Sequence, residues 1–408
     1  MALSRRGLLS LALAQRDLRA GTFVADVTPP LGAPLCYGLV PAGASVADKL
    51  WAKGVVLLPA GERPIVLCAV DWLGIGNSSR DRWLAVLAKA AGTIPERVAL
   101  HTVHQHDAPG DDMTAHALLP TGIALCDNDF ARGAALRVAE AVKRSKPLTV
   151  TGVTGGAAAV EGVASNRRIL GADGKVAFGR MTACRNSPMC AEPEGVIDPL
   201  LRSVSFWSGA KRIATLSYYA THPMSYYGKG VISADFVGQA RDSQTDTFQV
   251  HFTGGAGNIG AGKYNDGSPA MRPVLMGRMA SAMARAKAAE KPIPIDAVRW
   301  MSEPVRLPLR EGQGFGEAEI MASIGDVSLD PKQRANNARY LAYYRLVKAG
   351  RRVDLTALRL GSFSVIHMPG ELFVEYQLAA AMERASELVA TAAYGDYGPM
   401  YILSLIHI

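Results

Sequence analysis

The sequence predicts a mixed α/β fold in which β-sheets pack against helices. Short apolar runs rich in β-branched residues alternate with longer amphipathic stretches, and these two patterns are typical of strands and helices. The chain contains 41 glycines and 23 prolines, which mark the turns between them. Because 49% of the 408 residues are hydrophobic and only 20% are charged, the chain has the composition of a globular protein with a large core.

Strands and helices alternate in the first third of the chain. Residues 53–60 and 64–72 are apolar, β-branched runs bounded by turn residues, so we expect two strands. Residues 79–92 start with polar residues and continue as an amphipathic helix, and residues 97–106 form the next expected strand. Residues 129–146 predict a helix with acidic residues first and basic residues last, which complements the helix dipole.

The rest of the chain is rich in strands at first and in helices later. It shows no internal repeat and no low-complexity linker, so we expect one catalytic domain over residues 21–401. The expected strands cover residues 148–156, 201–208, 212–222, 247–255, 354–361 and 362–370, and the expected helices cover residues 269–291, 331–350 and 371–387.

The two ends of the sequence differ from the rest. Residues 1–20 contain an arginine pair before a short apolar stretch, which suggests a vestigial or partial export signal. Localisation therefore stays open between the periplasm or the exterior of a bacterial-type cell and the cytoplasm. Residues 402–408 follow without turn or capping residues, and we expect them to be a non-native tail.

The charge pattern argues against two classes of partner. The net charge is +8, but the basic residues are dispersed and form no long run interleaved with aromatics, so we expect no nucleic-acid binding. No apolar run approaches the roughly 18 residues of a membrane-spanning helix, so we expect no transmembrane segment. The positive charge would suit an anionic substrate or a membrane surface.

Cysteine usage leaves one pairing open. The five cysteines are Cys36, Cys68, Cys126, Cys184 and Cys190, an odd number without CxxC spacing. Cys68 lies in an apolar run and is expected to be a buried thiol. Cys184 and Cys190 can pair in an oxidising compartment, but free thiols throughout are the favoured interpretation.

Residues 101–112, "HTVHQHDAPGDD", hold three of the eight histidines of the chain. On a strand, His104 and His106 would point to the same face and His101 to the other. Two imidazoles at a strand end can share a metal, or one can bind it while the other transfers protons. The alternative is a structural histidine pair with satisfied hydrogen bonds.

Two further segments carry candidate ligands. His222 ends an apolar strand before a proline, and Asp235 downstream is a candidate partner of the ligands or a helix N-terminal acid. Glu371 follows a Met-Pro-Gly turn and opens an expected helix, where it complements the dipole or completes a His/His/Glu set for zinc. His367 is a rival ligand, but its place inside a strand favours a structural role.

The glycine-rich stretch from Gly257 to Lys263 fits the GxxxxGK pattern of a phosphate-binding loop. Tyr264 replaces the required Ser or Thr, and the following residues form a turn instead of a helix, so we reject a nucleotide triphosphatase. A loop that lets the backbone approach a substrate remains the expected role.

Taken together and in this order, the motifs resemble the neutral/alkaline non-lysosomal ceramidase family over most of the chain. The resemblance implies a ceramidase N-terminal-domain-like fold. The motifs are "FVADVTPPLGAPLCYG", "VLCAVDWLG", "HTVHQHDAPG", "SNRR", "THPMSYYGKGVISADFVG", "FTGGAGNIG", "MPGELFVE" and "YGDYGPMY".

The resemblance implies a Zn²⁺ site. It assigns His104 and His222 as the histidine ligands, Glu371 as the carboxylate ligand and Tyr401 as a tyrosine that also reaches the zinc. Tyr401 would also stabilise the oxyanion of the reaction.

The resemblance also implies two further roles. His106 matches the second catalytic histidine, which transfers protons, and Arg167 stands where the family has an arginine that orients the substrate. Two departures are Gly260, where the family has a serine, and the missing immunoglobulin-like C-terminal domain.

The expected function is a zinc-dependent amidohydrolase that cleaves the N-acyl bond of a small amide or a lipid-like substrate, as in sphingolipid metabolism. Metal-activated water would be the nucleophile. Two alternatives remain: a non-catalytic ligand-binding protein on a decayed hydrolase scaffold, and a metal-dependent esterase or phosphodiesterase.

Overall fold

The computed structural model describes residues 18–404. Most of the expected export segment, residues 1–17, and residues 405–408 of the expected tail lie outside this range. Of the remaining tail residues, Ile402 belongs to strand β24 (Tyr401–Ile402), which pairs in parallel with β22 (Glu371–Leu372). No helix in the described part of the chain is long and apolar enough to cross a membrane.

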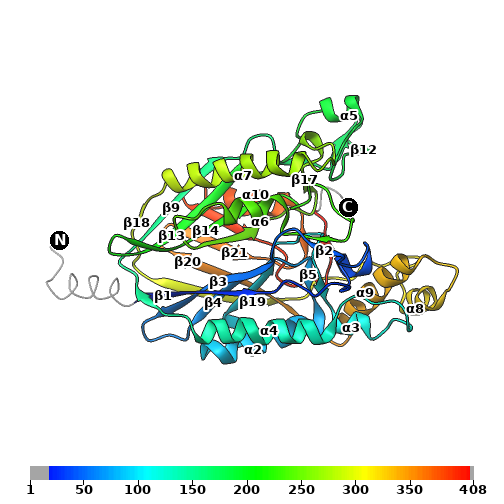
Figure 1. Ribbon diagram of the computed structural model, residues 1–408, viewed down its shortest axis with the longest axis horizontal. Helices are drawn as coiled ribbons and strands as arrows, with labels where there is room; N and C mark the ends of the chain where they lie inside the picture. The colour runs from blue at the N-terminus through cyan, green and yellow to red at the C-terminus, as the bar shows by residue number, and fades with distance from the viewer. Residues whose placement is uncertain (1–17, 405–408) are drawn as a thin grey trace.

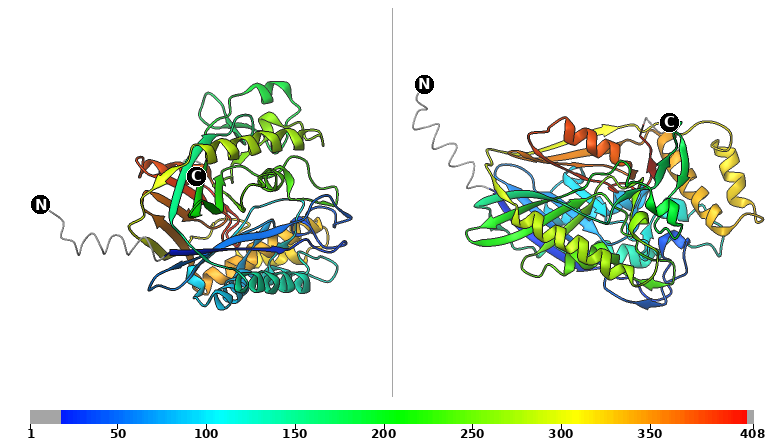
Figure 2. Two further views of the ribbon diagram at one scale, coloured as in Figure 1. Left: turned by 60° about the vertical axis from the view of Figure 1, so that its left-hand side comes forward. Right: turned by 90° about the horizontal axis from the view of Figure 1, so that it is seen from above.

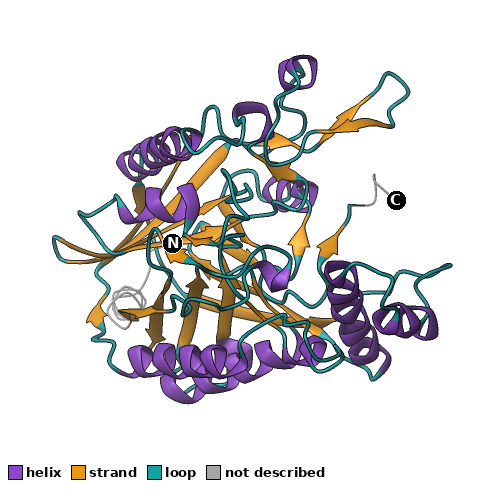
Figure 3. Cartoon of the chain, turned by 45° about the vertical axis from the view of Figure 1, so that its right-hand side comes forward, coloured by secondary structure: helices purple, strands orange, loops and turns teal. Residues whose placement is uncertain are grey.

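The centre of the molecule is a stack of two five-stranded sheets between helices (Figures 1 and 3). The first sheet has the order β6-β4-β3-β1-β8, with β4 and β6 parallel and the other neighbours antiparallel. Helices α2 (Asn77–Ala91) and α4 (Asn128–Lys143) cover its outer face. The strands are β1 (Leu18–Asp26), β3 (Trp51–Pro59), β4 (Ile65–Val70), β6 (Val98–Thr102) and β8 (Leu148–Thr149).

Strands β4 and β6 of the first sheet are buried on both faces, which explains why β4 is a continuous apolar run in the sequence. Along β4, Leu67 packs in the cluster shared with the second sheet, whereas its neighbour Cys68 packs in the cluster under the helices. This alternation follows from the two-residue period of a strand. The prediction that Cys68 is a buried thiol is confirmed.

The second sheet has the order β16-β14-β13-β9-β18, and helices α6 (Asp235–Asp242) and α7 (Met271–Ala288) lie on its outer side (Figure 2, right). Its strands are β9 (Gly152–Ala159), β13 (Leu200–Ser208), β14 (Lys211–Tyr219), β16 (Gln249–Thr253) and β18 (Lys291–Ile293). Strand β9 consists mostly of glycine and alanine, and these small residues allow α7 to lie close to the sheet.

Replacing Gly156 of β9 by alanine is expected to lower the free energy of unfolding by about 1–3 kcal/mol through overpacking. A Cβ at this position would lie 2.5 Å from the carbonyl oxygen of Ala286 in α7. Gly152 on the same strand is the control, because a Cβ there meets nothing within 4 Å. Urea denaturation of both variants tests this expectation, and equal stability of the two would contradict it.

The third sheet has the order β19-β20-β21-β23 and joins the same core, since Phe363 of β21 packs 6.2 Å from Tyr218 of β14, measured between ring centroids. Helix α10 (Val374–Met382) packs on β23, and helices α8 (Glu317–Gly325) and α9 (Pro331–Lys348) lie together at one end of the molecule (Figure 1). The strands are β19 (Val298–Val305), β20 (Val353–Leu360), β21 (Phe363–His367) and β23 (Leu388–Ala392).

The remaining short elements connect these layers and form the loops around the strand ends. The two-residue strands not yet given are β2 (Ser45–Val46), β5 (Gly74–Ile75), β7 (Gly110–Asp111), β10 (Ser165–Asn166), β15 (Val231–Ile232) and β17 (Ile259–Gly260). The others are β11 (Arg168–Leu170), β12 (Val176–Gly179), α3 (Met113–His116), α5 (Ser187–Ala191), η1 (Cys36–Gly38), η2 (Pro95–Arg97) and η3 (Gly262–Tyr264).

Three expected elements are wrong in extent. The strand expected over residues 148–156 is divided between β8 of the first sheet and β9 of the second sheet. The strand expected over residues 97–106 ends at Thr102, and His104 lies in a loop with φ of 74°. The helix expected over residues 371–387 starts only at Val374, because Glu371 belongs to β22 and pairs with Tyr401. His104 thus lies in a loop after a strand, whereas Glu371 begins a two-residue strand.

A further correction concerns the cysteines. Cys184 and Cys190 form a disulfide, with Cα atoms 6.0 Å apart, so the preference for free thiols is wrong for this pair. The short helix α5 brings Cys190 back toward Cys184, and the side chain of Asn186 caps it by accepting a hydrogen bond from Met189 N. Cys36, Cys68 and Cys126 are free and buried.

Candidate metal centre

The candidate centre lies where strands of different sheets end together. Thr102 N at the end of β6 donates to Tyr394 O just beyond β23, at 3.2 Å. Ala393 N donates to Thr253 O at the end of β16, at 2.8 Å. These backbone hydrogen bonds join the three sheets at one edge and fix the loops that leave them.

Hydrogen bonds from its backbone N–H and from one ring nitrogen fix His104 where the three sheets meet. Its N–H donates to Trp72 O at 2.9 Å, and its Nδ1 lies 2.7 Å from Leu73 O. Because a carbonyl oxygen can only accept, Nδ1 carries the proton and Nε2 presents a lone pair. The positive φ of His104 is unusual for a non-glycine residue, and such strain clusters at functional sites.

His222 is anchored in the same way from the second sheet. Its Nδ1 lies 2.7 Å from Ala256 O and 2.9 Å from Ile259 O, so its Nε2 is also unprotonated. The ring is fully buried, and its centroid lies 4.8 Å from that of His104. Histidines that bind metals commonly donate their second ring N–H to a backbone carbonyl, as both rings do here.

Glu371 completes the group from β22, which pairs with β24 in a separate two-stranded sheet. Its Oε2 lies 3.1 Å from His222 Nε2 and 3.6 Å from His104 Nε2. Burial alone would raise the pKa of Glu371, but His104 and His222 outweigh it and hold the pKa well below its usual range. The carboxylate is therefore ionised and suited to a cation.

The spacing of the three side chains fits one divalent ion. Ligand atoms at about 2.0–2.1 Å from a tetrahedral zinc lie roughly 3.3 Å from one another, close to the separations between Glu371 Oε2 and the two rings. His104, His106 and His222 also have ring nitrogens that all lie within 4.8 Å of one another. These three histidines can hold a metal ion. The overlapping set of His104, His222 and Glu371 has two nitrogens and one carboxylate, which is a set that catalytic zinc sites use.

His106 stands beside these ligands at the half-buried edge of the group. Its Nε2 lies 3.3 Å from His104 Nε2, and its Nδ1 lies 3.6 Å from the Sγ of Cys36. Burial, reinforced by His104 and His222, holds the pKa of His106 well below its ordinary value, so the ring is neutral at pH 7. The strand parity argument for His104 and His106 is wrong, because both lie in the loop after β6, yet the loop still brings their rings together.

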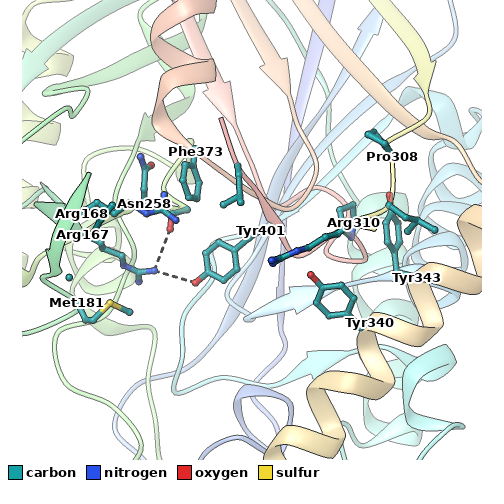
Figure 4. A pocket seen from close by; sticks show the side chains of 16 residues that line it. Arg167, Arg168, Met181, Asn258, Pro308, Arg310, Tyr340, Tyr343, Phe373 and Tyr401 are labelled. Atoms are coloured by element: carbon teal, nitrogen blue, oxygen red, sulfur yellow. Dashed lines mark hydrogen bonds between the residues drawn. The ribbon is translucent and has the colours of Figure 1, made fainter. Parts of the chain in front are cut away.

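Arg167 and Tyr401 meet next to the histidines. Arg167 Nη1 donates to the hydroxyl of Tyr401 at 3.2 Å and lies 3.4 Å from Gly257 O (Figure 4). Both side chains line a cavity of about 660 Å³, and Tyr401 connects this cavity to Glu371, with which its hydroxyl interacts. The hydroxyl of Tyr401 also has its pKa raised, first by burial and then by Glu371.

Tyr397 is a candidate that the sequence reading missed. Its hydroxyl donates to Glu371 Oε1 at 2.5 Å, and burial, together with Glu371, raises the pKa of Tyr397 well above its ordinary value. The run "YGDYGPMY" contains three tyrosines, and only the last was singled out. The ring of Tyr394 stacks on His104 with centroids 4.2 Å apart, so the whole run surrounds the group.

The side chains considered as alternatives lie elsewhere. Asp235 accepts hydrogen bonds from Ser225 and lies 3.4 Å from Arg272, so it is not a partner of His222, whose ring contacts backbone carbonyls and Glu371. His367 is buried inside β21 with its Nδ1 3.1 Å from Thr356 Oγ1, as expected for a structural residue.

His101 lies outside the group, as predicted, although the parity argument does not apply beyond the end of β6. Its Nδ1 lies 2.7 Å from Ala393 O. In the glycine-rich loop, Lys263 donates its ammonium hydrogens to the carbonyls of residues 190–192. A Cβ at Gly257 would lie 2.3 Å from Glu371 O, so the glycine lets this loop approach the ligand strand.

Replacing Tyr397 by phenylalanine is expected to weaken metal binding about 10-fold to 100-fold, the usual cost of losing a hydrogen bond that orients a ligand. Tyr394→Phe is the matched control, because the buried Tyr394 hydroxyl has no hydrogen-bond partner in the described part of the chain. Competition with a chromophoric chelator measures both affinities. Equal affinities for the two variants would show that the Tyr397 hydroxyl does not orient Glu371.

Comparison with solved structures identifies the fold. Neutral ceramidase from Pseudomonas aeruginosa matches with a TM-score of 0.69 at 18% sequence identity, covering 96% of this chain and 69% of that chain. A ceramidase complexed with C2 matches with a TM-score of 0.65 at 16% identity, covering 96% of this chain and 70% of that chain. No protein-family model and no curated protein matches the sequence. The predicted α/β, ceramidase-like fold is confirmed.

Proposed function

We propose that this protein is a zinc-dependent hydrolase of N-acyl amide bonds. The observation that carries the proposal is the convergence of His104 Nε2, His222 Nε2 and the ionised Glu371, with separations that suit one tetrahedral ion. The ceramidase structures with the same fold favour an amide of a lipid-like molecule as the substrate.

The reaction adds one water to the amide. The carbonyl carbon gains a bond to the water oxygen and loses its bond to nitrogen, which leaves a carboxylic acid and an amine. Zinc supplies Lewis acidity, which activates water near neutral pH and polarises a carbonyl oxygen.

His106 is placed to move the proton. Its ring is neutral and borders the ligand group, so Nε2 can accept a proton from the attacking water and return it to the leaving nitrogen. Arg167 and Tyr401 form a hydrogen-bonded pair in the lining of the cavity, where they can orient the polar part of the substrate and stabilise developing negative charge. Tyr401 stays a candidate zinc ligand, and Tyr397 orients Glu371.

Removing the metal is expected to abolish hydrolysis. The purified protein should contain about one zinc per chain by elemental analysis, lose activity toward N-acyl amides after dialysis against a chelator, and regain it when zinc is added. Parallel assays with matched esters and phosphodiesters test the alternative substrates. Amide hydrolysis that survives complete metal removal would overturn the proposal, and binding of the amide without turnover by the zinc-loaded protein would favour the ligand-binding alternative.

A further inference from the structure

The cavity lined by Arg167 and Tyr401 carries positively charged side chains and no negatively charged ones. Its lining includes three arginines, Arg167, Arg168 and Arg310, and no aspartate, glutamate or lysine. A neutral amide needs no such concentration of positive charge. Arginine is the side chain best suited to hold carboxylate, sulfate or phosphate groups, because its planar fork can donate two parallel hydrogen bonds.

The arginines retain unused donors. The Nε of Arg167 and the Nη1 of Arg168 are buried and have no hydrogen-bond partner in the described residues. Buried polar groups normally find partners, so these two nitrogens are unused donors on side chains that line the cavity. A Cβ at the buried Gly260 would lie 3.4 Å from Arg167 Nε, so the glycine only avoids crowding this nitrogen.

The arginines come from two parts of the chain, Arg167 and Arg168 from one segment and Arg310 from another. The guanidinium of Arg168 lies over the ring of Phe373 at 4.4 Å, and that of Arg310 lies over Phe315 at 4.1 Å. In Figure 4, Arg310 extends into the cavity from the side opposite to Arg167 and Arg168, with Tyr401 between them. The carboxylate of Glu375 attracts the guanidinium of Arg168 electrostatically, but Glu375 does not line the cavity.

The rest of the lining is apolar or aromatic. Phe373, Leu309 and Met181 provide apolar walls, and Tyr340 and Tyr343 lie on the side of α9. A volume of about 660 Å³ falls within the usual range of small-molecule sites. The cavity therefore combines a surface for a hydrocarbon segment with donors for an anion, both next to the candidate metal.

We propose that this cavity is a subsite for an anionic group, so that the preferred substrate is an N-acyl amide with a carboxylate or a phosphate on its polar part. The inference rests on the proposed amidase function and names its substrate class. Arg168 and Arg310 determine this specificity together with Arg167, which also borders the reacting group.

Three matched substrates test the subsite: N-lauroylglycine, N-lauroylethanolamine phosphate and neutral N-lauroylethanolamine. The wild-type zinc enzyme is expected to prefer at least one anionic substrate over the neutral one by about 10-fold or more in kcat/KM, the size of a charge-assisted hydrogen bond. The two anionic substrates distinguish a carboxylate from a phosphate. Arg168→Gln and Arg310→Gln are each expected to reduce this preference about 10-fold.

Arg132→Gln is the control for net charge, because Arg132 lies exposed on α4 and outside the cavity. It is expected to leave the preference unchanged. A wild-type enzyme without anion preference, or an equal effect of all three variants, would overturn the inference.

Calorimetric binding of N-lauroylglycine and N-lauroylethanolamine separates this inference from the proposed function. Anion-selective binding that depends on Arg168 and Arg310, without hydrolysis by the zinc-loaded protein, would support the subsite and overturn the amidase function. Hydrolysis without anion preference would support the function and overturn the subsite.

Discussion

Replacing His104 by asparagine is expected to abolish both metal binding and hydrolysis. Asparagine tolerates the positive φ at this position, and its side-chain N–H can replace the Nδ1–H that donates to Leu73 O. The variant is therefore expected to keep the loop backbone, while it loses the imidazole ring with its Nε2 lone pair and its stacking on Tyr394. The loss in affinity should exceed the roughly 10–100-fold effect of removing an outer-shell partner.

Elemental analysis, chelator competition and turnover of an N-acyl amide together measure this effect. His116→Asn is the control, because His116 lies in α3 outside the histidine group and its Nδ1 accepts a hydrogen bond from Leu125 N. A folded His104→Asn protein that retains stoichiometric zinc would exclude His104 as a ligand and with it the proposed centre.

Replacing His106 by alanine is expected to leave zinc in place and to reduce kcat about 10²–10⁴-fold, the usual contribution of a positioned proton-transfer group. The reason is that His104, His222 and Glu371 supply the ligand set without it, whereas no other neutral histidine in the described residues borders that set. The KM of the amide should change much less than kcat.

The metal content of the His106 variant decides between two roles. Zinc retained with lost turnover supports proton transfer. Zinc lost together with turnover would make His106 a ligand, which the separation of 3.3 Å between its Nε2 and that of His104 also permits geometrically. Zinc and turnover both retained would remove His106 from the mechanism.

The sequence predicted the elements of the fold better than the local geometry of the centre. Helix α9 at Pro331–Lys348 agrees with the expected 331–350, because its periodicity and Asp330 cap are local signals. The loop after β6 was not predictable in the same way. The positive φ of His104 depends on hydrogen bonds to Trp72 and Leu73, which are about thirty positions away in the sequence.

The candidate residues likewise divide into those that the sequence predicted and those that depend on contacts between distant segments. His104, His222 and Glu371 were singled out from separate segments, and the structure brings their ligand atoms together. Tyr397 was missed, because its contact with Glu371 depends on the course of the chain after β23. The disulfide between Cys184 and Cys190 was also not favoured, because their spacing alone does not reveal the turn formed by α5.

The anchoring of the two histidine rings has a consequence for evolution. Both Nδ1 atoms depend on main-chain carbonyls, of Leu73 for His104 and of Ala256 and Ile259 for His222. Every amino acid carries the same carbonyl, so mutation of these three anchoring positions preserves the acceptor as long as the path of the backbone is kept. The centre thus has mutational robustness, and its surroundings can diverge widely in sequence without reorienting the imidazoles.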